Sequence, residues 1–223
     1  MLRRAFDVVI RPPYVGLRDS ATELLFDKRL GVRTSGELQL DELGIAAEGR
    51  ERYKGVPWSM LPRILSRRTV DANDVFLDIG SGMGRALLVA ASYPFSRVIG
   101  VELSPHLNDI AQQNIHHLGS RLRCQDITVV NADAVEYRVP DDVTVVFMAN
   151  PFQGDIFRRV VDNILASHDR NPRRLRIVYV NPREERFLLS TGRIRTIRKI
   201  RGYRPGRDWS RSNSAALYEV GRG

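Results

Sequence analysis

The stretch Phe76-Leu77-Asp78-Ile79-Gly80-Ser81-Gly82-Met83-Gly84-Arg85 decides the fold of this chain. Its first half is apolar apart from Asp78, as expected of a strand covered on both faces. Residues 86–91, which follow it, are mostly strong helix formers. The glycines between them let the backbone approach a ligand closely and leave amide groups available near a helix N-terminus. The stretch therefore predicts a buried strand, a ligand-binding turn and a helix.

The spacing of the glycines limits the classes of ligand that the turn is expected to bind. They fall at positions 80, 82 and 84 as GxGxG, whereas dinucleotide dehydrogenases prefer GxGxxG. A nicotinamide oxidoreductase is therefore disfavoured. Asp78 precedes the turn, and a second acidic residue, Glu102, ends the next apolar run, Val98-Ile99-Gly100-Val101-Glu102-Leu103. The sequence thus places an acidic residue at the end of each of two successive predicted strands.

Asp78, the glycine turn and Glu102 together resemble class I methyltransferases, which use S-adenosylmethionine as cofactor. The resemblance covers about residues 75–155. It implies that Asp78 and the glycine turn surround the methionine part of the cofactor and that Glu102 binds the ribose hydroxyls. A carboxylate suits the second role, because its two oxygens can accept from two vicinal hydroxyls at the edge where open α/β sheets bind ligands.

The remainder of the chain alternates between strands and helices. We expect strands at 75–80, 97–103, 127–131, 143–149 and 175–180, and helices at 84–92, 105–118 and 155–167. Such βαβ repetition predicts a mostly parallel sheet with helices on both faces. The resemblance adds a final antiparallel hairpin, for which 194–200 and 215–220 are suitable. The expected fold is α/β, a Rossmann-like seven-stranded sheet with an N-terminal helical extension.

Residues 1–68 lack this alternation, and we interpret them as an N-terminal helical cap and lead-in to a cofactor-binding domain at 69–223. Helical segments are expected at 21–30, ended by Gly31, and at 38–43 and 61–67. Tyr53 and Trp58 lie just before the first strand of the domain. They either form a lid over the cofactor or pack against the core.

The third and fourth strands end in further candidate residues. Asp133, after Val129-Val130-Asn131-Ala132, resembles the acidic position that contacts adenine: its carboxylate would accept from the exocyclic amine, and the Ala134 amide would donate to a ring nitrogen. Capping of the next helix is the alternative. The resemblance implies cofactor contacts from Asp78, Gly80, Ser81, Gly82, Gly84, Glu102, Leu103, Asp133, Ala134 and Asn150.

Asn150-Pro151-Phe152 ends the fourth strand, the place that faces the transferring methyl in class I enzymes. Asn150 and Phe152 are therefore the candidate catalytic residues: the Asn150 amide oxygen would accept from an amine, and the Phe152 ring would stack on the acceptor. This sequence has one proline fewer than the Asn-Pro-Pro-aromatic motif of adenine and glutamine methyltransferases, and the difference argues against those two acceptors. The motif set most resembles an uncharacterised bacterial group of class I enzymes and partly resembles non-SET histone-lysine methyltransferases. A second pair, Asn181-Pro182, is interpreted as a turn, with a place in the acceptor pocket as the alternative.

Composition limits the protein class. With 223 residues and 43% hydrophobic content, the chain is long enough for one good core. The net charge of +9 comes almost entirely from arginine and leaves a nucleic-acid partner open, although a solvated face is the simpler reading of the basic runs at 170–176 and 193–207. A single cysteine, Cys124, excludes an internal disulfide and a cysteine-based zinc site.

No long apolar run or convincing metal-ligand spacing is found. His106, His116 and His117 lack accompanying carboxylates, so no metal is expected. The apolar run near the N-terminus, Val8-Val9-Ile10, is shorter than a signal-peptide core, and no run reaches the roughly 20 residues that span a bilayer. We therefore expect a soluble protein with no membrane partner, and the single cysteine favours a reducing, cytoplasmic setting.

The sequence therefore predicts a methyltransferase that uses S-adenosylmethionine and an undetermined nitrogen or oxygen acceptor in a protein, a nucleic acid or a small molecule. The first alternative is a non-catalytic basic module that binds nucleotides or nucleic acid with the same fold. The second is the disfavoured nicotinamide oxidoreductase. The sequence does not indicate an oligomeric state.

Overall fold

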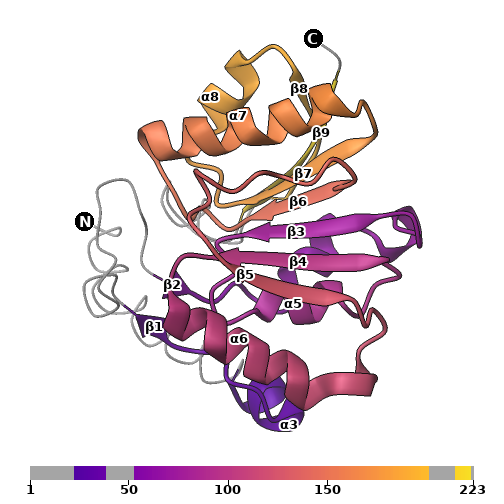
Figure 1. The fold of residues 1–223 in the computed structure, drawn as a ribbon, viewed down its shortest axis with the longest axis vertical. Coiled ribbons are helices and arrows are strands. Elements are labelled where there is room, and N and C mark those ends of the chain that lie inside the picture. Colours follow the sequence, from indigo (N-terminus) through magenta and orange to yellow (C-terminus); the bar gives the residue numbers. More distant parts are fainter. Residues whose placement is uncertain (1–22, 39–52, 201–213, 222–223) are drawn as a thin grey trace, which may run out of the picture.

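The computed structural model describes residues 23–38, 53–200 and 214–221, and these form a seven-stranded sheet and a separate two-stranded sheet (Figure 1). The large sheet has the strand order β5-β4-β3-β6-β7-β9-β8. Its strands are β3 (Val75–Ile79), β4 (Arg97–Glu102), β5 (Ile127–Asn131), β6 (Val145–Met148), β7 (Leu175–Val180), β8 (Ile194–Ile200) and β9 (Ala215–Val220). The small sheet pairs β1 (Glu37–Leu38) with β2 (Tyr53–Lys54).

The first five strands of the large sheet are parallel, and β9 is antiparallel to both of its neighbours, β7 and β8. The described helices are α3 (Lys28–Leu30), α4 (Met60–Ile64), α5 (Arg85–Ala90), α6 (Pro105–Leu118), α7 (Gly154–Arg170) and α8 (Glu185–Ser190), with shorter turns η2 (Glu23–Asp27), η3 (Arg67–Thr69) and η4 (Gly119–Arg121). The predicted fold class, a mostly parallel seven-stranded sheet with a terminal antiparallel pair, is confirmed.

Two apolar cores cover the two faces of the sheet. On one face, Leu77 and Ile79 of β3 pack with α7, which contributes Phe157 and Ile164. On the other face, Phe76 of β3 packs with buried side chains of α4 and α5. Successive residues of a strand point to opposite faces, so a central strand with helices on both sides must be apolar throughout. That requirement explains why the run before the glycines has no polar residue except Asp78.

Element bounds agree closely with expectation in the domain that follows residue 69. The predicted helix 105–118 is α6 itself, and Ser104 caps it by accepting from the Leu107 amide at 3.3 Å. The helices expected at 84–92 and 155–167 are α5 and α7, with shifted ends. Helix α8 was not predicted.

The N-terminal region differs from the expectation of a wholly helical cap. Leu38, expected to begin a helix, lies in β1 and pairs with Tyr53 in β2, while 39–43 lies outside the described residues. The expected helix 21–30 is described from residue 23, first as the π-helical turn η2 and then as α3. Gly31 ends α3 in a left-handed conformation with a φ of 72°, as its position predicted. The division into a cap at 1–68 and a domain at 69–223 stays a prediction.

Candidate active site

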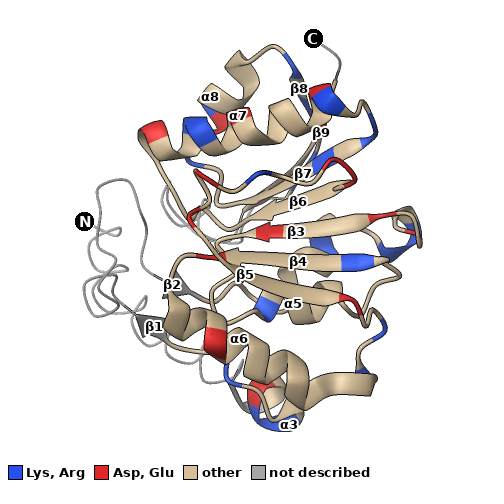
Figure 2. Ribbon diagram, in the orientation of Figure 1, with Lys and Arg blue, Asp and Glu red and all other residues tan. Residues whose placement is uncertain are grey.

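The candidate site lies at the carboxyl edge of the sheet, beside the point where the strand order reverses. The chain proceeds outward from β3 through β4 to β5 and then returns to β6 on the other side of β3. Open α/β sheets bind ligands in the crevice at such a reversal, outside the carboxyl ends of the strands. Figure 2 shows acidic residues at the carboxyl ends of β3 and β4, on this edge.

The glycine loop between β3 and α5 is fixed to the end of β4. The amides of Gly80 and Ser81 both donate to the Val101 carbonyl, at 2.9 and 3.1 Å. Gly80 has a φ of 81°, and a Cβ added to it would lie 2.7 Å from the Cβ of Pro151. Only glycine fits there, because the loops after β3 and β6 touch across the reversal point. The glycine loop and the Asn150-Pro151 turn therefore form one structure.

Glu102, at the end of β4, lies between the glycine loop and the start of α6. Its Oε2 accepts from the Gly82 amide and its Oε1 from the Ser104 amide, both at 2.8 Å. Burial raises the pKa of Glu102, although these backbone amides act in the opposite direction. Each carboxylate oxygen has a second lone pair, so both remain able to accept from a ligand hydroxyl.

Asp78 is the more deeply buried acid, with 2% of its surface exposed. Burial raises its pKa well above the usual range, and the negative charge of Glu102 raises it further. No residue of the described ranges donates a hydrogen bond to its side chain. Two interacting buried carboxyls disfavour each other's ionised form, and a ligand that carries a positive charge or several donors would relieve that cost.

Two further buried polar atoms near the glycine loop have no hydrogen-bond partner within the described ranges. They are the Ser81 hydroxyl oxygen and the Nδ2 of Asn108 in the first turns of α6. Native proteins rarely leave buried polar atoms unpaired, so such atoms mark a place for a polar ligand. Ser81 belongs to the predicted cofactor set, whereas Asn108 was missed.

The end of β5 shows a turn rather than a preformed ligand contact. Asp133 Oδ1 accepts from the Val135 amide at 3.0 Å, which is the capping alternative, and the Ala134 side chain is buried in the core. Asn131, not predicted as a site residue, donates from Nδ2 to the carbonyls of Glu102 and Leu103, both at 2.9 Å. It therefore ties the end of β5 to the end of β4. Adenine contact by Asp133 and Ala134 stays a prediction.

Asn150, after β6, is held by a residue that sequence reasoning missed. Its Oδ1 accepts from the Tyr179 hydroxyl of β7 at 3.1 Å, and its backbone φ is 54°. Burial raises the pKa of Tyr179 far above its usual range, so the hydroxyl stays protonated and donates. Phe152 is only 8% exposed and packs in the core shared with α7, which leaves little ring surface for stacking. In the structure the Phe152 ring packs in the core, and its stacking on the acceptor stays a prediction.

Residues 27–36, here called the N-terminal strap, are attached to the glycine loop by a buried arginine. Arg85 follows Gly84 directly and donates to Thr34 Oγ1, the Thr34 carbonyl, Ser35 Oγ and the Val56 carbonyl at 2.7–2.9 Å. Its Nη2 lies 3.8 Å from Asp27 Oδ1, with both side chains almost wholly buried. A charged residue immediately after a glycine loop was the sequence signal for this contact.

Asn114 of α6 provides a second attachment of the strap. It accepts from the Arg33 amide and donates to the Arg33 carbonyl, both at 2.8 Å, and also donates to the Met83 carbonyl at 3.0 Å. Trp58 packs with Val32 of the strap and donates from Nε1 to Asp27 at 3.3 Å. Of the two interpretations of Trp58, the structure shows packing. The strap thus rests on the segment that would carry the cofactor.

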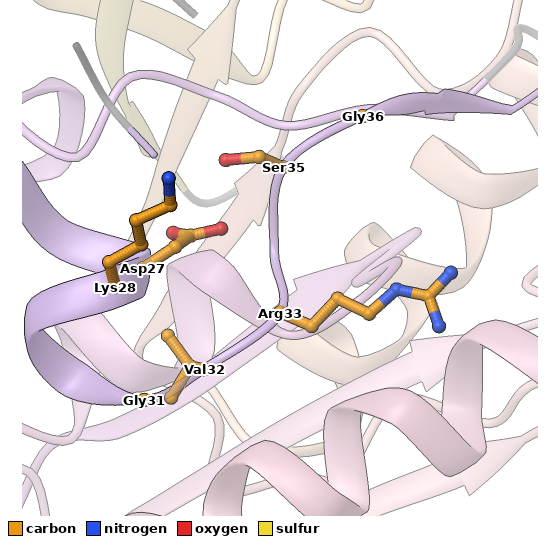
Figure 3. A pocket seen from close by; sticks show the side chains of 7 residues that line it. All are labelled: Asp27, Lys28, Gly31, Val32, Arg33, Ser35 and Gly36. Carbon is orange, nitrogen blue, oxygen red and sulfur yellow. The ribbon is translucent and has the colours of Figure 1, made fainter. Parts of the chain in front are cut away.

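An open hollow of about 440 Å³ lies at the strap. Its lining residues are Asp27, Lys28, Gly31, Val32, Arg33, Ser35 and Gly36. Figure 3 shows the side chains of Asp27, Lys28 and Ser35 gathered on one side and Arg33 pointing away from them. None of the strand-end residues lines it, so this hollow is separate from the candidate cofactor site.

Arginines of the basic run at 170–176 form ion pairs and hydrogen bonds within the protein. Arg170 pairs with Asp141, Arg173 donates to the Val143 carbonyl, and the buried Arg176 pairs with Asp74. In the second run, Arg193 and Arg195 pair with acidic residues and Lys199 pairs with Glu185, while 201–207 lies outside the described residues. Figure 2 shows blue and red segments interspersed over the described ribbon. The described part of these runs therefore has mainly structural partners.

Within residues 23–38, 53–200 and 214–221, no three His, Cys, Asp or Glu side chains come together in a way that could hold a metal ion. No helix there combines the length and apolar character needed to cross a bilayer.

Residues 76–167 match a family model described as a methyltransferase domain. The matched segment runs from β3 to α7 and contains every predicted cofactor residue. Residues 76–167, on this Rossmann-like α/β fold, are therefore similar to methyltransferase domains. A search of curated proteins found no match.

Solved structures share the fold at low sequence identity. A tRNA methyltransferase from Methanocaldococcus jannaschii matches with a TM-score of 0.53 and 15% identity over 77% of this chain, and the present chain covers 52% of that one. An RNA methyltransferase from Salinibacter ruber in complex with S-adenosyl-L-homocysteine matches with a TM-score of 0.52 and 19% identity, over 75% of this chain and 94% of that one. A dimethyladenosine transferase from Plasmodium falciparum matches with a TM-score of 0.53 and 13% identity, over 74% of this chain and 62% of that one. This chain thus spans about half the length of the first of them.

Proposed function

We propose that this protein is a methyltransferase that uses S-adenosylmethionine. The observation that carries the proposal is the buried acidic pair at the carboxyl ends of β3 and β4, held around a glycine loop at the reversal point of the sheet. Support comes from the methyltransferase domain match and from a structural neighbour that was solved with S-adenosyl-L-homocysteine.

The residues present fit the chemistry of that cofactor. Its amino group and positive charge would satisfy Asp78, whose buried carboxyl has no hydrogen-bond donor within the described ranges. The ribose hydroxyls would donate to the free lone pairs of Glu102, and the unpaired Ser81 hydroxyl would gain a partner. Gly80, Gly82, Gly84, Leu103, Asp133 and Ala134 complete the proposed set, with Asn150 at the boundary with the methyl acceptor.

When bound, the cofactor supplies an electrophilic methyl group on a sulfonium, so the difficult chemistry is its own. Asp78 and Glu102 would hold the donor, and the Asn150 turn would align the acceptor beside it. Alignment of two reactants in this way is worth several orders of magnitude in rate.

The acceptor proposed is a nitrogen or oxygen nucleophile, with nucleic acid the favoured source. The net charge of +9 suits a polyanionic partner, and the solved structures that share the fold include a tRNA and an RNA methyltransferase. The alternative is a basic module with this fold that binds nucleotides without transferring a group. Cofactor binding without any methylated product would favour that alternative.

Calorimetric titration of the protein with S-adenosylmethionine tests the proposal. Glu102→Ala should weaken binding at least tenfold, because hydrogen bonds to a charged group contribute about 1.5–3 kcal/mol each. The matched control is Glu136→Ala, which removes an exposed acid paired with Arg159 and should leave affinity unchanged. Absence of binding to folded wild-type protein, or tight binding that survives Glu102→Ala, would contradict the proposed cofactor site.

A further inference from the structure

Two Asn-Pro pairs follow neighbouring parallel strands at matching positions. Met148 in β6 and Tyr179 in β7 are register partners, and Asn150 and Asn181 each lie two residues further along. Their φ angles are 54° and 52°, and within the described ranges these are the non-glycine residues with positive φ. Asparagine tolerates this conformation better than most residues, and adjacent strands lie about 4.8 Å apart. The two strand ends therefore make the same turn side by side.

The two asparagine side chains differ in their partners. Asn150 Oδ1 accepts from the Tyr179 hydroxyl, which fixes the amide and leaves one lone pair of that oxygen. Asn181 Oδ1 is buried and accepts no hydrogen bond from any residue in the described ranges. Its backbone amide donates to the Ser214 carbonyl at 2.9 Å, so the turn itself is fixed without the side chain. A buried acceptor without a donor is destabilising, and a bound donor would relieve that cost.

Resting on the proposed function, we propose that Asn181 binds the methyl acceptor and that this acceptor is a neutral amino group with two hydrogens, the exocyclic amino group of a nucleobase. One hydrogen is donated to the free lone pair of Asn150 Oδ1 and the other to Asn181 Oδ1. The nitrogen lone pair is then directed away from both amides, toward the methyl donor. As the new N–C bond forms, the C–S bond breaks with its electron pair going to sulfur, and the surplus proton on nitrogen passes to water.

The charge of the surrounding groups favours a neutral amine over a lysine ammonium. The acceptors at these strand ends are two uncharged amides beside the Tyr179 hydroxyl, which burial keeps protonated. The acidic residues that follow β7 are engaged, Glu184 by the Gly154 amide and Glu185 by Tyr218 and Lys199. An ammonium is recognised best by carboxylates and must lose a proton before it can attack. An aromatic amino group is neutral, so it needs neither a carboxylate partner nor the loss of a proton before it attacks.

The test uses Asn181→Gly, which removes the side chain and suits the positive φ, and Asn181→Asp, which keeps two acceptor oxygens. Tritiated S-adenosylmethionine is supplied with unmodified transcripts of tRNA and ribosomal RNA, and the nucleosides are separated and identified by mass spectrometry. Methyl should appear on an exocyclic amino nitrogen. We expect Asn181→Gly to lower kcat/KM at least tenfold with the Kd for S-adenosylmethionine within twofold of wild type, and Asn181→Asp to recover most of that loss. Asn73→Gly, in an exposed turn, is the control and should behave as wild type.

Each other outcome has a distinct meaning. Binding of S-adenosylmethionine with methyl found on a ring nitrogen, a carbon or a ribose oxygen overturns the amino-group assignment. So does binding with no methylated RNA nucleoside, including the case in which a protein lysine is methylated instead. Loss of thermal stability in both Asn181 variants without a selective loss of kcat/KM would assign the residue to the turn alone. Failure of the wild-type protein to bind S-adenosylmethionine rejects the proposed function itself, and this inference with it.

Discussion

Removing the carboxylate of Asp27 should release the N-terminal strap from the glycine loop. The Asp27 carboxylate accepts from the Thr34 amide and hydroxyl, both at 2.8 Å, and from Trp58 Nε1 at 3.3 Å. It also lies 3.8 Å from the Arg85 guanidinium, and the two side chains are 5% and 6% exposed. Asp27→Ala leaves a buried positive charge without its counterion and three donors without an acceptor.

Breaking a buried ion pair by removing one partner costs about 3–5 kcal/mol of unfolding free energy. Arg85 keeps four hydrogen bonds to neutral oxygens in the variant, which places the expected loss near the lower limit, about 3 kcal/mol. For a chain of this size each kcal/mol lowers Tm by about 2–4 °C, so Tm should fall by about 6–12 °C. Because Arg85 directly follows the glycine loop, affinity for S-adenosylmethionine should fall as well.

Thermal unfolding and urea denaturation measure the first effect, and calorimetry the second. The control is Asp155→Ala, which removes an aspartate that is 90% exposed and paired with Arg158 at 3.2 Å. Such surface pairs contribute less than about 1 kcal/mol, so its Tm should change by no more than a few degrees. Equal Tm shifts in the two variants would refute the conclusion that the buried pair holds the strap.

Three other changes separate stability from binding. Asp78→Asn should raise Tm at neutral pH and weaken cofactor binding. Burial raises the folded-state pKa of Asp78, so the contribution of this one carboxyl to wild-type stability is greatest below about pH 4 and is lost as pH rises through its folded pKa, a loss that the variant lacks. A difference between wild type and variant that does not change with pH would contradict this. Gly80→Ala should lose about 2 kcal/mol more than Gly192→Ala, because both have positive φ but only the first places a Cβ against the proline after Asn150, and equal losses in urea denaturation would count against that contact. Tyr179→Phe should reduce kcat by about tenfold, since it no longer fixes Asn150, with Tm lowered by only about 2–4 °C; a wild-type methylation rate would remove Tyr179 from the site.

The fold was predictable because its pattern is local. The apolar run before the glycines, the helix after Ser104 and the apolar runs of the later strands each follow from short-range periodicity and capping. The N-terminal region was predicted less well: Leu38 lies in a strand that pairs with Tyr53, a partner fifteen positions away. Short strands of two residues have no periodicity to detect, and helix α8 is only six residues long.

The sequence by itself determined that glycines and two acids would meet at the carboxyl edge of a parallel sheet, because strand ends and turns are encoded by neighbouring residues. Only the tertiary structure decided how those residues are held. The Asp27–Arg85 pair joins residues 58 positions apart, and the hydrogen bond from Tyr179 to Asn150 joins residues 29 positions apart. The unpaired oxygen of Asn181 depends on burial by the segments packed around it. Hydrogen-bond satisfaction and desolvation depend on every group packed around an atom, and no local pattern in a single sequence records them.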